Sequence, residues 1–197
     1  MSGWWAVSYV VLWCLVAALT VVVVALARQV GTLHMRLAPS GAFENDDEGP
    51  PIGQAPPPYA AVDTQGNHVT IGGPAEPKFL LFISPGCRVC SEVAPGLKAA
   101  ARAGSLAPFL IVEGEPGTGG NGRDMSRYGS PTIHSTDLSA SYGIPGTPFA
   151  VILDSVGVVR AKGTVNNLEQ MEGLVDTARR RIDGEEGTHA GANHRTS

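Results

Sequence analysis

The chain has 197 residues, a formal net charge of −4 and three cysteines. This length suits one ordinary domain with additional segments, and three cysteines are too few for a scaffold held together by disulfides. The negative charge and the lack of a basic stripe with interleaved aromatic residues argue against a nucleic-acid-binding protein.

An apolar stretch without charged side chains comes first, at residues 6–27. As a helix it is long enough to cross about 30 Å of hydrocarbon, with Trp4 and Trp5 at one membrane interface and Arg28 beyond the other end. We therefore predict a transmembrane anchor and juxtamembrane helix at residues 1–37, in contact with the lipid bilayer. The alternative is a cleavable signal peptide, but the apolar run is too long for one and no basic residue precedes it.

Residues 38–58 are acidic and rich in proline, so we predict an extended, mobile linker that cannot bury a core.

Arg28 and Arg36 follow the span, which by the positive-inside rule weakly favours a cytoplasmic position for the rest of the chain. Cys14 lies inside the apolar stretch and is interpreted as a small apolar filler.

The folded domain is expected at residues 59–182, followed by a polar, disordered tail at residues 183–197. Strands are predicted at residues 60–63, 68–71, 78–83, 108–112, 149–153 and 158–162, and helices at residues 87–102, 135–142 and 167–182. A glycine-rich surface loop is expected at residues 114–122. The order of strand, helix and strand in the middle of the chain indicates a βαβ unit in an α/β fold.

A Cys-x-x-Cys pair opens the helix that follows strand 78–83. Cys87 and Cys90 share one helix face, where their Cα atoms are close enough for a disulfide. The helix N-terminus and Arg88 should lower the pKa of Cys87 below the ordinary value of about 8.5. Cys87 is therefore the predicted nucleophile and Cys90 the resolving thiol of a redox-active disulfide. A zinc site would usually need a second cysteine pair, which is absent, so we predict no metal and no cofactor.

Two further features resemble thioredoxins. Pro95, five residues after Cys90, matches the proline that kinks the active-site helix of thioredoxins, and residues 142–149 resemble their segment that ends in a cis-proline beside the disulfide. The resemblance implies a thioredoxin-like fold, a central mixed sheet flanked by helices, here preceded by one transmembrane helix. It also implies a cis bond before Pro148 and a substrate-binding role for Thr147 and Pro148.

The chain departs from thioredoxins at two positions. Gly86 stands where they carry a tryptophan before the first cysteine, and Leu81 stands where they carry a buried aspartate. That aspartate helps to move a proton from the resolving thiol, and its absence argues against a fast, general reductase. Glu92 is close in sequence but is expected to face solvent.

More narrowly, the layout resembles MauD, a family of methylamine-utilisation accessory proteins. The resemblance rests on the N-terminal span, the juxtamembrane residues 26–42, the core at residues 80–90 and the segment 142–149. It implies a membrane-tethered thiol-disulfide oxidoreductase on the extracytoplasmic (periplasmic) face. The action would be to form, reduce or isomerise disulfides of a client protein, the small subunit of methylamine dehydrogenase. A membrane electron-transfer partner could supply electrons, and no nucleic acid is expected as a partner.

Two other functions would use the same cysteines. A peroxiredoxin-like thiol peroxidase is suggested by Ser84, three residues before Cys87, but the expected proline is Leu80 and no arginine partner is evident. A copper or zinc chaperone could add His134 to the two thiolates, since soft thiolates suit Cu(I). His134 lies in a Ser/Thr-rich segment that we predict to be a solvated surface loop.

Overall fold

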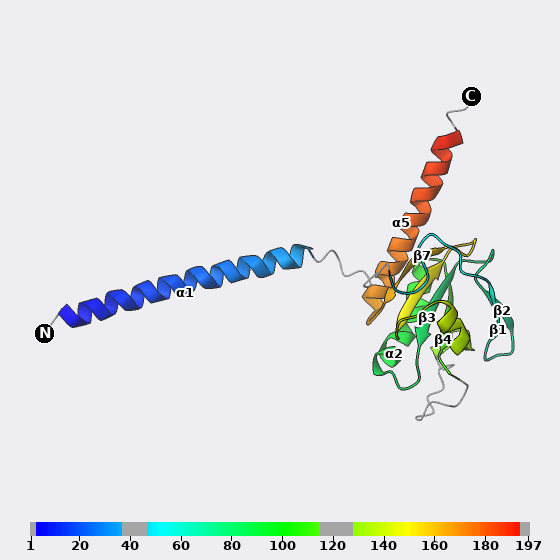
Figure 1. Ribbon diagram of the computed structural model, residues 1–197, viewed down its shortest axis with the longest axis horizontal. Coiled ribbons are helices and arrows are strands. Elements are labelled where there is room, and N and C mark those ends of the chain that lie inside the picture. The colour runs from blue at the N-terminus through cyan, green and yellow to red at the C-terminus, as the bar shows by residue number, and fades with distance from the viewer. Residues whose placement is uncertain (1–2, 37–46, 115–127, 194–197) are drawn as a thin grey trace. The chain divides into compact units, whose positions relative to one another are not determined.

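The computed structural model describes residues 3–36, 47–114 and 128–193, which fall into two compact units. The first unit holds one helix of 34 residues, α1 (Gly3–Arg36) (Figure 1). Its segment Gly3–Val22 is long and apolar enough to cross a membrane, with a mean hydropathy of 2.2. The predicted anchor and juxtamembrane helix therefore form one continuous helix, because no proline interrupts its backbone hydrogen bonds.

The second unit is built on a five-stranded sheet in the order β5-β4-β3-β6-β7 (Figure 1). Its strands are β3 (Lys78–Ile83), β4 (Ala107–Val112), β5 (Thr132–His134), β6 (Phe149–Leu153) and β7 (Val159–Thr164). β3, β4 and β5 run parallel, whereas β6 is antiparallel to β3 and β7 is antiparallel to β6. The predicted mixed sheet is confirmed.

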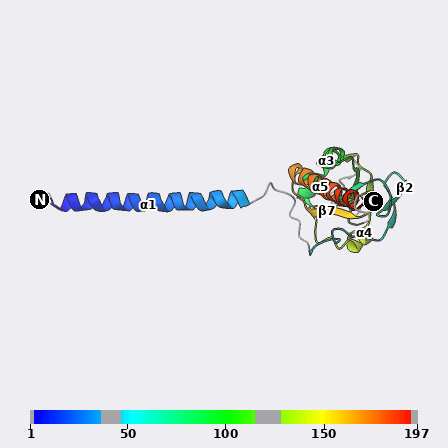
Figure 2. The same cartoon turned by 90° about the horizontal axis from the view of Figure 1, so that it is seen from above.

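β3 is the central strand, and all six of its residues are buried, as expected for a strand covered on both faces. Alternate side chains enter different apolar clusters, so that Leu81 and Ile83 pack in one and Leu80 and Phe82 in the other. The first cluster is completed by α2 (Arg88–Val93), α3 (Leu97–Ala103) and α5 (Leu168–Asn193). The second is completed by α4 (Thr136–Ser141) and the hairpin of β1 (Tyr59–Val62) and β2 (His68–Ile71). Figure 2 shows α3 and α5 on one side of the sheet and α4 on the other.

The helix that begins after Cys87 is broken once. A 3₁₀ turn, η1 (Ala94–Gly96), separates α2 from α3 and carries Pro95 in its first turn. Proline has no backbone N–H and its ring clashes with the preceding turn, so the kink predicted at this residue is confirmed.

Residues 47–58, which we call the strap, do not form the mobile linker that their composition predicts. Pro50 is buried, and Ile52 is half-buried against the second apolar cluster. Each of these contacts removes apolar surface from water. The folded domain therefore begins before Tyr59, and the predicted boundary at that residue is wrong.

The strap also completes the hydrogen bonding of an edge strand. The Gly53 N–H donates to the Val159 carbonyl at 2.9 Å, and the Val159 N–H donates to the Gln54 carbonyl at 2.9 Å. Val159 opens β7, which lies at the end of the sheet and has outward backbone groups that need partners. Composition alone gives no sign of this pairing.

Two further differences concern β5 and the C-terminal part of the chain. The Ser/Thr-rich segment that we predicted as a loop contains β5, whose three residues pair with β4. So short a strand carries little local signal, and its partner determines the conformation. α5 continues to Asn193, where we predicted a disordered tail from Asp183, because no proline ends the helix. Apart from Gly114, the predicted glycine-rich loop and the segment after it up to residue 127 lie outside the described residues.

The strap should contribute measurably to stability. The free energy of unfolding of a soluble chain that begins at Tyr59 should be about 4–8 kcal/mol smaller than that of a chain that begins at Asp47. The shorter chain lacks two hydrogen bonds, worth about 1 kcal/mol each, and the burial of two apolar side chains, worth roughly 1–3 kcal/mol each. Urea unfolding followed by circular dichroism measures the difference. Equal unfolding midpoints for the Tyr59 and Asp47 chains would contradict the packing described here.

Candidate active site

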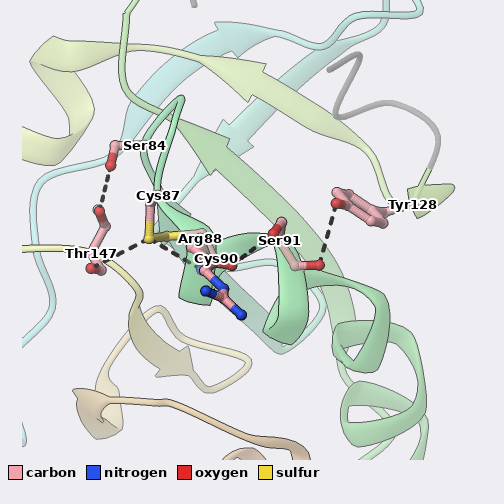
Figure 3. The surroundings of a disulfide bond; sticks show 7 residues. All are labelled: Ser84, Cys87, Arg88, Cys90, Ser91, Tyr128 and Thr147. Carbon is pink, nitrogen blue, oxygen red and sulfur yellow. Dashed lines mark hydrogen bonds between the residues drawn. A yellow bond between two sulfur atoms is a disulfide. The ribbon is translucent and has the colours of Figure 1, made fainter. Parts of the chain in front are cut away.

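Cys87 and Cys90 are joined by a disulfide at the start of α2, with their Cα atoms 5.3 Å apart (Figure 3). Cys87 is the N-cap residue of α2, and its Sγ accepts a hydrogen bond from the Cys90 N–H at 3.1 Å. Cys87 is half-buried, whereas Cys90 is fully buried. In the dithiol form the same amide would stabilise a thiolate on Cys87. The geometry therefore supports the predicted division into an accessible nucleophile and a buried resolving thiol.

Arg88 contributes less than the sequence suggests. Its side chain is 91% exposed, and its Nε lies 3.3 Å from Oε1 of Glu92, one turn further along the helix. A guanidinium that is paired in water exerts only a weak, screened field on its neighbours. The helix N-terminus, more than Arg88, is then the feature that favours a thiolate at Cys87. Glu92 faces solvent, as predicted.

The segment that carries the predicted substrate-binding residues lies against the disulfide. The Thr147–Pro148 peptide bond is cis, as the resemblance to thioredoxins implies. The Thr147 carbonyl oxygen lies 3.9 Å from Cys87 Sγ (Figure 3). Pro148 is buried. The Thr147 carbonyl is a backbone acceptor that lies next to the sulfur of Cys87.

Ser84 connects this segment to the end of β3. Its Oγ lies 2.7 Å from Oγ1 of Thr147, and Figure 3 shows the bond on the far side of Cys87 from Cys90. Sequence reasoning considered Ser84 only for a peroxidase and missed this contact. Nothing in the local sequence indicates it, because 63 positions separate the two residues.

Leu81, which replaces the buried aspartate of thioredoxins, packs in the same apolar cluster as Cys90. Tyr128 packs against this cluster from another side and donates its hydroxyl hydrogen to the Ser91 carbonyl at 3.4 Å (Figure 3). The surroundings of the resolving cysteine are thus strongly apolar, and such surroundings favour a thiol over a thiolate.

His134 is not the solvated loop residue that we predicted. It is the last residue of β5, half-buried, and its Nδ1 is buried without a hydrogen-bond partner. Within residues 3–36, 47–114 and 128–193, no group of three or more His, Cys, Asp and Glu side chains could hold a metal ion. The geometry therefore gives no support to a metal chaperone that uses His134. Cys14 is a free, exposed cysteine on α1.

Curated relatives cover most of the chain. No protein-family model matches it. "Methylamine utilization protein MauD" of Methylorubrum extorquens is 35% identical over 175 residues, which are 86% of this chain and 84% of the relative. The protein of the same name from Paracoccus denitrificans is 34% identical over 184 residues, or 91% of each chain.

Solved structures share the fold at lower identity. The thioredoxin domain of a thiol-disulfide oxidoreductase from Bacteroides vulgatus superposes with a TM-score of 0.51 at 18% identity, over 66% of this chain and 96% of its own. A thiol:disulfide interchange protein from a Bacteroides species has a TM-score of 0.51 at 18% identity, over 71% and 95%. The predicted thioredoxin-like fold is confirmed.

The two thiols should differ sharply in reactivity after reduction. In a Cys14→Ala chain we expect iodoacetamide to alkylate Cys87 much faster than Cys90, because Cys90 is buried. We expect the rate to reach half its maximum below about pH 8.5, the ordinary pKa of a cysteine, because the N-cap hydrogen bond and the helix N-terminus favour the thiolate form of Cys87. Mass spectrometry of peptides quenched at successive times measures both rates. Arg88→Ala is the control for the side-chain charge and should move the midpoint only slightly. Faster alkylation of Cys90 would reverse the assigned roles.

Proposed function

The chain belongs to the MauD family of methylamine utilization proteins, and on this premise we propose that it is a membrane-tethered thiol-disulfide oxidoreductase that acts in methylamine utilisation. The observation that carries the proposal is the Cys87–Cys90 disulfide at the start of α2, with the Thr147 carbonyl beside the accessible sulfur. A structural disulfide would need neither a partly exposed cysteine nor a neighbouring backbone acceptor.

The reaction proceeds through a mixed disulfide. In the reduced protein, the Cys87 thiolate attacks one sulfur of a client disulfide, and the other client sulfur leaves and takes up a proton. Cys90 then loses its proton and attacks Cys87 Sγ, which re-forms the protein disulfide and releases the second client thiol. Two electrons pass from the protein to the client. The same steps in reverse form a disulfide in the client. If the released client thiol attacks a different sulfur of the client before Cys90 acts, the client disulfide is isomerised.

Thr147 and Pro148 hold the client chain in this scheme. Thr147 presents its carbonyl 3.9 Å from Cys87 Sγ, while Ser84 ties the Thr147 side chain to the end of β3. An extended client segment that bonds to this carbonyl would bring its own sulfur in line with Cys87. Arg88 has a minor role in tuning the thiolate.

The proposed client is the small subunit of methylamine dehydrogenase, and the proposed site of action is the extracytoplasmic face of the membrane. α1 provides a helix that could anchor the domain there, and disulfide chemistry belongs to oxidising compartments. A membrane partner would return the Cys87–Cys90 pair to its working redox state after each turnover.

Substituting each cysteine separates the steps of the reaction. In cells that grow on methylamine, Cys90→Ser should accumulate a mixed disulfide between Cys87 and the client, because the resolving thiol is gone. Cys87→Ser should accumulate none. Non-reducing electrophoresis and mass spectrometry identify the trapped chain, with Cys14→Ala in both variants. The methylamine dehydrogenase small subunit in the trap would support the proposed client. No trapped chain at all with Cys90→Ser would count against the oxidoreductase.

The side of the membrane can be tested with the same thiols. In a Cys14→Ala chain, intact spheroplasts are first reduced and washed free of reductant, and a membrane-impermeant maleimide should then label Cys87, because the domain faces outward. Labelling only after the cells are lysed would place the domain in the cytoplasm, as Arg28 and Arg36 weakly favour by the positive-inside rule. A cytoplasmic protein with one exposed cysteine serves as the control for leakage.

A further inference from the structure

The strap touches the segment that carries the cis-proline. Gly49 has a φ of +73°, and a Cβ atom placed on it would lie 2.9 Å from Cε1 and 3.0 Å from Cζ of the Phe149 ring. Real Cβ atoms do not approach other atoms so closely. Only glycine therefore fits at this position, both for its backbone conformation and for its contact with the ring.

Phe149 links this contact to the candidate active site. It is the first residue of β6 and directly follows Pro148, whose carbonyl accepts a hydrogen bond from the Val165 N–H at 3.3 Å. Its ring is buried in the second apolar cluster. Protein interiors are closely packed and transmit displacements. A shift of the ring would therefore move the backbone of Thr147 and Pro148.

The strap is also fixed by hydrogen bonds to Val159, which keep Gly49 in contact with Phe149. Gly53 and Gln54 bond to Val159 of β7, the strand next to β6. The strap is thus held at Phe149 of β6 and at Val159 of β7, and Pro50, which lies between Gly49 and Gly53 in the sequence, is buried.

We propose that the strap is a positioning element of the active site: the contact between Gly49 and the Phe149 ring sets the place of the Thr147–Pro148 segment against Cys87. The inference rests on the proposed function, because it concerns how that site holds an extended client chain. The chemistry of the thiols does not depend on the strap, since Cys87 is stabilised by the Cys90 amide. Loss of the contact should impair reactions with peptide disulfides and leave reactions with small thiol reagents unchanged.

Two glycines of the strap provide a matched pair for the test. Gly53 has a φ of +77°, close to that of Gly49, but a Cβ atom placed on it would meet nothing within 4 Å. Gly49→Ala and Gly53→Ala therefore impose similar backbone strain, and only Gly49→Ala presses on Phe149. The full chain, with Cys14→Ala, is reduced in detergent micelles. It is then mixed either with iodoacetamide or with a peptide of about twelve residues closed by one disulfide.

With the peptide, we expect the second-order rate constant for a single round of disulfide exchange to be about tenfold lower for Gly49→Ala than for Gly53→Ala, since small displacements of a substrate site are costly. Alkylation by iodoacetamide should be equal in the two variants. Equal peptide rates would overturn the inference. A wild-type chain that is alkylated but leaves the peptide disulfide intact would instead contradict the proposed function.

A second pair of variants separates positioning from damage to the fold. Phe149→Leu removes the two ring atoms that a Cβ on Gly49 would meet. In that background, adding Gly49→Ala should change the peptide rate no more than adding Gly53→Ala does. A further tenfold loss there would show that Gly49→Ala acts by another route, and the inference would fail. Melting temperatures of all variants identify any chain that has simply unfolded.

Discussion

The position of Cys87 depends on the burial of β3. All six residues of this strand are buried between β4 and β6, so the strand cannot slide without moving both apolar clusters. The chain leaves it through Ser84, Pro85 and Gly86, and Gly86 adopts a φ of +84°. A bulky side chain is strained in that conformation, which gives a physical reason for glycine where thioredoxins carry tryptophan. The turn then delivers Cys87 to the N-cap of α2.

The C-terminal end of β3 also fixes the Thr147–Pro148 segment, which lies beside Cys87. Ser84 bonds to Thr147, and Thr147 presents its carbonyl to Cys87. The strap contacts Phe149, two residues after Thr147, through Gly49. Residues 84–90 and 147–149, which are distant in sequence, therefore meet at the disulfide, and residues 47–58 contact the second of these segments through Phe149. Preorganisation of this kind reduces the entropy that a client must lose on binding.

Sequence patterns predict well those features that local chemistry determines. The continuous apolar run of β3 gives its bounds, the N-cap position gives the Cys87 geometry, and Pro95 gives the break between α2 and α3. They fail where distant partners decide the conformation. A proline-rich, acidic segment gives no local sign that it will pair with Val159, and the three residues of β5 form a strand only because β4 lies beside them. The contact between Ser84 and Thr147 was missed for the same reason.

The exchange of the buried aspartate for Leu81 affects the second half of the reaction most. In the proposed reaction the first attack uses Cys87, which is half-buried and accepts a hydrogen bond from the Cys90 amide. The second needs a thiolate on Cys90, which is fully buried in a cluster that includes Leu81. An apolar environment disfavours a negative charge on Cys90. The attack of Cys90 on the mixed disulfide is therefore slower here than it would be beside a carboxylate that accepts the Cys90 proton. A long-lived mixed disulfide allows a client time to rearrange its remaining thiols. A long-lived mixed disulfide therefore suits the maturation of one client with many thiols better than the rapid reduction of many different proteins.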